Sequence, residues 1–74
     1  MDLFVSVHDR IRDLDIQLSM AMVRTYKEAD IIDLDGTSHI CILYILNNGL
    51  RFEEEFDTTS DRDDKMATLD EYLA

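Results

Sequence analysis

The 74-residue sequence contains no proline or tryptophan, only two glycines, one cysteine, and seven Lys and Arg residues against seventeen Asp and Glu. One cysteine cannot form a disulfide within the chain, and the start Met1-Asp2-Leu3 lacks a basic segment ahead of an apolar one. Both features predict a cytoplasmic protein without a signal peptide. The longest apolar run, residues 40–46, is far shorter than the roughly 20 residues of a membrane-spanning helix.

The scarcity of cations narrows the possible partners. A net charge of −10 argues against direct binding to nucleic-acid phosphates or to anionic membranes, because both would be repelled. The apolar content of 46% is nevertheless sufficient for a core. We therefore expect one small folded domain that spans residues 1–74.

The first third of the chain has apolar residues at the spacing of one helical face. They are Leu3, Val7, Ile11, Leu14, Leu18, Met22 and Tyr26. This period predicts a long N-terminal helix, which Asp2 or Ser6 would cap. Alternation of apolar with polar or small residues over 14–23 also fits a strand, and that alternative stays open. We favour the helix because its period extends over about six turns.

The rest of the chain has the pattern of strands and turns. Asp35-Gly36 and Asn48-Gly49 are hairpin dipeptides, and they separate β-rich segments at 31–34, 37–46 and 50–56. After a polar stretch, Ser60 is suited to cap a final helix over 61–73, whose apolar stripe is Met66, Leu69 and Leu73. The predicted fold is therefore α+β: a long N-terminal helix, a three-stranded antiparallel β-meander and a short C-terminal helix, in the order αβββα.

Two-residue turns would sort the sheet side chains onto two faces, because cross-strand partners share a face. In that register Ile45 lies opposite Phe52, and the predicted core face holds Ile32, Leu34, Cys41, Leu43, Ile45, Leu50, Phe52 and Phe56. The other face carries an apolar stripe of Ile40, Ile42, Tyr44 and Leu46. Either the last helix covers this stripe, or it forms an interface with a partner or with a second copy in a homodimer.

One segment resembles a catalytic signature. Residues 31–37, with Asp33, Asp35, Gly36 and Thr37, resemble the first motif of the haloacid dehalogenase-like phosphatases. The resemblance implies that Asp33 is a nucleophile and Asp35 a general acid/base. That family also needs a doubly wound parallel sheet and later Lys and acidic motifs, which 74 residues do not supply. Because Asp35-Gly36 is already explained as a hairpin turn, we expect no enzyme activity.

Metal and cofactor sites are not expected either. The acidic residues Asp30, Asp33 and Asp35 do not have the spacing of a calcium-binding loop. Cys41, His39 and His8 are too few for a structural zinc site. We expect Cys41 to be a buried core residue and His8 to lie on the surface.

Carboxylates are the strongest functional signal, and they are spread along the chain. A band predicted to contact a partner consists of Glu53, Glu54, Glu55, Asp57, Asp61, Asp63 and Asp64. A rigid domain that displays such a band offers a protein the charge pattern of a nucleic-acid backbone. The sequence thus predicts a small acidic non-catalytic binding protein. As a nucleic-acid mimic, it would inhibit a nuclease, restriction or CRISPR effector, or repair enzyme by occupying its basic groove.

Two alternatives stay open beside that prediction. The acidity can serve solubility alone. The protein can instead be a homo-oligomeric interaction or assembly module that works through the apolar stripe of Ile40, Ile42, Tyr44 and Leu46.

Overall fold

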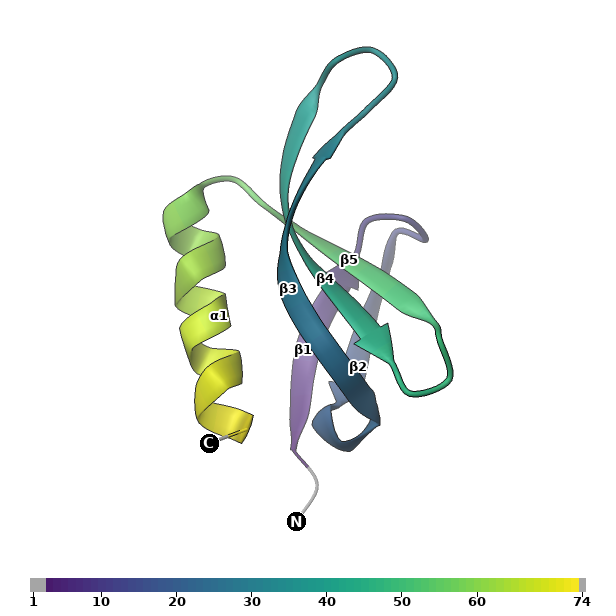
Figure 1. Cartoon of the computed structure of the whole chain (residues 1–74), viewed down its shortest axis with the longest axis vertical. Coiled ribbons are helices and arrows are strands. Elements are labelled where there is room, and N and C mark those ends of the chain that lie inside the picture. Colours follow the sequence, from purple (N-terminus) through teal and green to yellow (C-terminus); the bar gives the residue numbers. More distant parts are fainter. Residues whose placement is uncertain (1–2, 74) are drawn as a thin grey trace.

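The computed structural model describes residues 3–73, the last of them by its backbone alone. It is a five-stranded antiparallel sheet, in the spatial order β2-β1-β5-β4-β3, with one α-helix against one face (Figure 1). The elements are β1 (Phe4–Asp9), β2 (Leu14–Ser19), the 3₁₀ turn η1 (Met20–Met22), β3 (Val23–Ile32), β4 (Ser38–Leu46), β5 (Arg51–Phe56) and α1 (Thr59–Leu73).

The predicted N-terminal helix was wrong, and with it the αβββα order, so that α+β describes the fold only loosely. Strands β1, β2 and the first half of β3 occupy that segment instead. Side chains four positions apart share a face in a strand as well as in a helix, so most steps of the apolar period fit both structures. The one step of three, from Ile11 to Leu14, falls where the chain turns between β1 and β2. The strand alternative was right for β2, and η1 ends the alternation at Met20.

The turn between β1 and β2 carries no glycine or proline, so it has none of the residues that usually indicate a turn. Its last residue, Asp13, adopts a left-handed backbone with a φ of 54°, a conformation that Asp tolerates better than most residues. The Asp9 carboxylate accepts the Ile11 backbone N–H at 3.3 Å and supports the turn from within. Ser6, proposed as a helix cap, is an exposed residue of β1, and Asp2 lies outside the described residues.

The predicted three-stranded meander is only part of a five-stranded sheet, its first strand is β3 (Val23–Ile32) rather than 31–34, and both hairpins have three-residue loops. In the first, the Gly36 N–H bonds the Asp33 carbonyl and the Asp33 N–H bonds the Thr37 carbonyl, each at 2.9 Å. Gly36 and Gly49 take the last loop position with φ of 88° and 89°, the left-handed residue of a bulged turn. Each extra loop residue shifts the register by one, so Tyr44, rather than Ile45, lies opposite Phe52.

This shift exchanges the two faces of β4. The predicted second-face stripe, Ile40, Ile42, Tyr44 and Leu46, points to the core, and Ile42 and Tyr44 have no exposed surface. Phe52 and Phe56 pack on the same cluster, whereas Leu43 and Ile45 lie on the opposite face. The sorting of Cys41, Leu43 and Ile45 into one core with Phe52 and Phe56 was therefore wrong.

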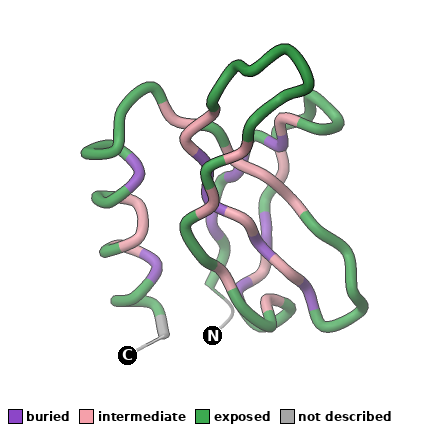
Figure 2. The backbone as a smooth tube through the Cα atoms, turned by 45° about the horizontal axis from the view of Figure 1, so that its top comes forward, coloured by how far each residue is buried: buried purple, intermediate pink, exposed green. Residues whose placement is uncertain are grey.

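Helix α1 covers this core face, as one of the two alternatives for the apolar stripe required. Leu69 is fully buried and Met66 packs beside it, so purple and pink segments line the inner side of the helix in Figure 2. The side chain of Leu73 lies outside the description. Thr58, not Ser60, caps the helix, because its Oγ1 accepts the Asp61 N–H at 3.1 Å. Within residues 3–73, no helix has the length and apolar character needed to cross a membrane.

Candidate functional site

The three glutamates of β5 do not form one acidic band. Neighbouring residues of a strand point to opposite faces, so Glu54 lies on the helix side and Glu53 and Glu55 on the other. The Glu54 carboxylate accepts the Tyr44 hydroxyl at 2.8 Å and lies 3.4 Å from the Lys65 ammonium. Burial, and next the Glu54 charge, raises the pKa of Tyr44. Glu54 thus has its polar partners, Tyr44 and Lys65, within the same chain on the helix side of the sheet.

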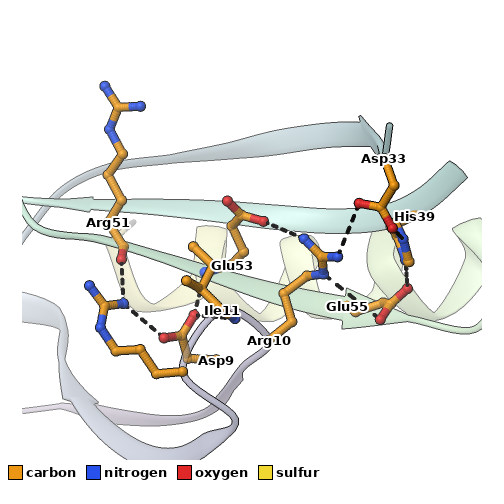
Figure 3. Close-up of polar contacts among 9 residues, drawn as sticks. Asp9, Arg10, Ile11, Asp33, His39, Arg51, Glu53 and Glu55 are labelled. Carbon is orange, nitrogen blue, oxygen red and sulfur yellow. Dashed lines mark hydrogen bonds and ion pairs between the residues drawn. The ribbon is translucent and has the colours of Figure 1, made fainter. Parts of the chain in front are cut away.

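Glu53 and Glu55 belong to an ionic cluster on the open face, which we call the hairpin clamp. It brings together residues from two strands and two connections, namely Arg10, Asp33, His39, Glu53 and Glu55 (Figure 3). The Arg10 guanidinium donates to Glu53 at 2.9 Å and lies 3.7 Å from Asp33 and 4.0 Å from Glu55. The hydrogen bond to Glu53 is the main cause that raises the pKa of Arg10. The clamp joins the β1–β2 turn to β5 and to the loop end of the β3–β4 hairpin.

His39 lies between two carboxylates of the clamp. Its Nδ1 contacts Glu55 and its Nε2 lies 2.5 Å from Asp33. A carboxylate on each ring nitrogen favours the imidazolium form, in which both nitrogens donate hydrogen bonds. The hydrogen bond to Glu55, and next that to Asp33, raises the pKa of His39. Glu53 and Glu55 are therefore matched by cations of the same chain.

The phosphatase-like motif has structural partners throughout. Asp33 binds His39 and Arg10 in the clamp, and Asp35 accepts the Thr37 N–H at 2.9 Å, which lowers the pKa of Asp35. The motif lies in an antiparallel hairpin rather than at the carboxyl end of a parallel strand. The fold that the resemblance implies is thus not the fold of this chain.

The exposed carboxylates of the predicted band that lie outside the hairpin clamp are found around the start of α1. Asp57, Asp61 and Asp64 are exposed, and no ion pair involves them among the described side chains. Asp63 is 60% exposed and lies 3.6 Å from the Nε of Arg62. These four residues match the second half of the predicted band.

Two further carboxylates extend this surface onto β3. Arg62 has only 9% of its side chain exposed, and it donates to Asp30 at 2.9 Å and lies 3.5 Å from Glu28. Both carboxylates remain more than half exposed. Together the six residues form what we call the acidic ridge, namely Glu28, Asp30, Asp57, Asp61, Asp63 and Asp64, with Arg62 as its one cation.

The sequence reasoning missed Glu28 as a member of this surface because it placed residues up to about 28 in a helix. The available signal was the alternation of Tyr26, Glu28 and Asp30, which puts three polar side chains on one face of a strand. Their structural partners confirm that shared face, because Tyr26 donates to Asp70 of α1 at 2.5 Å. Burial, and next this bond, raises the pKa of Tyr26 to about 12.

The remaining metal-ligand types are dispersed. Cys41 is buried as predicted, and burial raises the pKa of its thiol, which makes it a poor nucleophile. His8 is exposed as predicted, although on β1, with Asp15 at 2.6 Å and Asp13 at 3.0 Å. Across residues 3–73, no group of three His, Cys, Asp or Glu side chains has the arrangement of a metal site.

Comparisons with protein-family models, with curated proteins and with solved structures gave no match.

Proposed function

We propose that this chain is a small acidic, non-catalytic binding protein that acts in the cytoplasm. Its partner is a protein with a basic groove, of the kind that nucleic-acid enzymes such as nucleases, restriction or CRISPR effectors and repair enzymes use for DNA or RNA. The acidic ridge would occupy that groove in place of the nucleic acid.

The observation that carries the proposal is that some carboxylates have partners within the chain, whereas those of the acidic ridge have only one cation among them. Inside the hairpin clamp and under the helix, carboxylates have cationic or hydroxyl partners of the same chain. On the acidic ridge, one guanidinium lies near three of the six carboxylates, and all six remain exposed. A surface of uncompensated charge steers an oppositely charged partner and increases the association rate.

The scaffold of the ridge supports the same function. Arg62 ties Glu28 and Asp30 of β3 to the first turns of α1, so carboxylates from two elements keep fixed relative positions. A rigid array avoids the ordering cost that a flexible acidic tail would incur on binding. Assembly through Ile40, Ile42, Tyr44 and Leu46 loses its basis, because Ile42, Tyr44 and Leu46 are buried and Ile40 is half-buried in the chain's own core.

The test is affinity capture from a cell extract at low salt, followed by a salt gradient and identification of the eluted proteins by mass spectrometry. We expect a nucleic-acid-binding enzyme that elutes as salt rises, with at least a tenfold loss of affinity over a few-fold increase in salt. Excess nucleic acid should compete with the protein for that enzyme.

A pair of matched variants assigns the binding to the ridge. Asp61→Asn with Asp64→Asn removes two ridge charges and should weaken binding by about tenfold. Asp13→Asn with Asp15→Asn removes two charges that are 92% and 91% exposed on the β1–β2 hairpin, and it should leave the affinity within about twofold. A captured partner that is indifferent to salt and to both variants would refute the mimic function.

A further inference from the structure

The most exposed large apolar side chains of the described chain lie at one place, the tip of the β3–β4 hairpin. Leu34 is fully exposed and Ile32 is 70% exposed. Figure 1 shows that this hairpin extends past the start of α1 and away from the other strands. Apolar side chains concentrated on a protruding surface are typical of interaction sites.

The tip is held in place rather than left free. His39 and Arg10 of the hairpin clamp bind Asp33 at the first position of the turn. The turn itself is closed by the two Asp33 backbone bonds and by the Asp35 carboxylate on the Thr37 N–H. A pre-ordered loop presents Leu34 to a partner with little entropic cost.

The apolar tip continues the acidic ridge. Glu28, Asp30 and Ile32 alternate along β3 and therefore share one face of the hairpin, and Leu34 follows at the turn. The surface thus passes from carboxylates around Arg62 to two exposed apolar side chains. The charge of the chain limits which partner can bind this surface. A net charge of −10 repels both an anionic lipid surface and a second copy of the chain.

We propose that the hairpin tip inserts Leu34, with Ile32 beside it, into an apolar pocket that borders the basic groove of the partner. This inference rests on the proposed function and adds an anchor to it. Steering comes from the acidic ridge, and the anchored leucine slows dissociation, as buried apolar residues at the centre of interfaces do.

Two peptide probes separate the anchor from the charge. The ¹⁵N-labelled protein is titrated at low salt with a short oligolysine and with an equally long peptide of alternating lysine and leucine. Both peptides should shift the amide signals of ridge residues. Only the lysine–leucine peptide should shift those of residues 32–36, and Leu34→Gln should weaken its binding by about fivefold.

Two controls define the comparison. Leu34→Gln should leave the oligolysine affinity within about twofold, because it removes no charge. Leu50→Gln changes a leucine that is 47% exposed next to the other hairpin loop, and it should leave both affinities unchanged. Neither position is buried, so both variants should fold.

Four results would overturn the inference. If Leu34→Gln binds the lysine–leucine peptide as the native chain does, while both peptides still shift the ridge, the anchor is wrong and the acidic function stands. If neither peptide shifts the ridge, the proposed function fails as well. A native dimer that Leu34→Gln dissociates in sedimentation would assign the tip to a second copy, and binding to phosphatidylcholine vesicles that the variant loses would assign it to lipid.

Discussion

The carboxylate of Asp9 accepts the backbone N–H of Glu53 at 3.1 Å, although the two residues are 44 positions apart in the sequence. The same oxygen accepts the Ile11 N–H, and the other oxygen binds Arg12 at 2.8 Å. Asp9 is completely buried and lies opposite Glu54, at the position where β1 pairs with β5. This carboxylate therefore helps to fasten the β1–β2 hairpin to β5, beside the Arg10 N–H, which donates to the Glu53 carbonyl at 2.8 Å (Figure 3).

Removal of this carboxylate should be costly. Burial alone would raise the pKa of Asp9, but the hydrogen bonds from Arg12, Glu53 and Ile11 outweigh it and leave the pKa lowered. Asp9→Ala leaves those donors unpaired and should cost about 2–3 kcal/mol of the free energy of unfolding, measured by urea denaturation. Asp9→Asn keeps an acceptor and should cost less.

Asp57→Ala is the matched control for Asp9, because it removes an exposed carboxylate and should change stability by no more than about 0.5 kcal/mol. Equal effects at the two positions would contradict the anchoring role of Asp9.

Stability should depend on pH through His39. The pKa of its imidazolium is raised by Glu55 and then by Asp33, so the folded state binds this proton more tightly than the unfolded state does. The stabilisation is complete below the unfolded pKa of about 6.5 and is lost as pH rises through the raised folded pKa. The urea midpoint should therefore fall as the pH rises above about 6.5.

The variant His39→Gln should flatten that fall, and so should His8→Gln, because Asp15 and Asp13 raise the pKa of His8 in the same direction. The double variant should have a nearly level midpoint over this range. An unchanged slope in the double variant would show that neither histidine is linked to folding.

The sequence predicted the second half of the fold far better than the first. Asp35-Gly36 and Asn48-Gly49 mark both hairpins, and the polar stretch before Asp61 marks the start of α1. The β1–β2 turn has no such mark, because Asp13 takes the left-handed conformation without glycine and Asp9 supports the turn from a distance. A periodic pattern with steps of four cannot distinguish a helix from two strands when the turn between the strands has no typical turn residue.

Half of the acidic surface was predictable, because its residues on and before α1 are neighbours in the sequence. Asp57, Asp61, Asp63 and Asp64 follow one another in and before α1, so their proximity is local. Glu53, Glu54 and Glu55 are separated from these four residues because the tertiary fold gives them partners within the chain. The main example is Arg10, which binds Glu53 although the two residues are 43 positions apart. No spacing rule within the chain reveals such a pair.

The loop length of the hairpins is testable at Gly49. Its φ of 89° is costly for residues with a side chain, although a Cβ there would meet no atom within 4 Å. Gly49→Ala should therefore cost about 1–2 kcal/mol through the backbone alone. Gly49→Asn should cost less, because Asn adopts this conformation more readily. Equal stability of the alanine variant and the native chain in thermal denaturation would rule out the left-handed position.

The attachment of α1 depends on Leu69. This side chain is fully buried against the cluster of Ile42, Tyr44 and Leu46, so Leu69→Ala creates a cavity under the helix and should cost about 2–5 kcal/mol. Ala67→Gly, at an exposed position two residues earlier, lowers helix propensity without a cavity and should cost about 1 kcal/mol. Urea denaturation followed by circular dichroism measures both.

If the two variants lose the same stability, Leu69 adds nothing beyond helix formation, and the face of β4 must be covered in another way. If Leu69→Ala is several-fold more costly, the helix is what keeps Ile42 and Tyr44 from solvent. The acidic ridge then depends on that packing too, because Asp61, Asp63 and Asp64 keep their positions only while α1 stays docked.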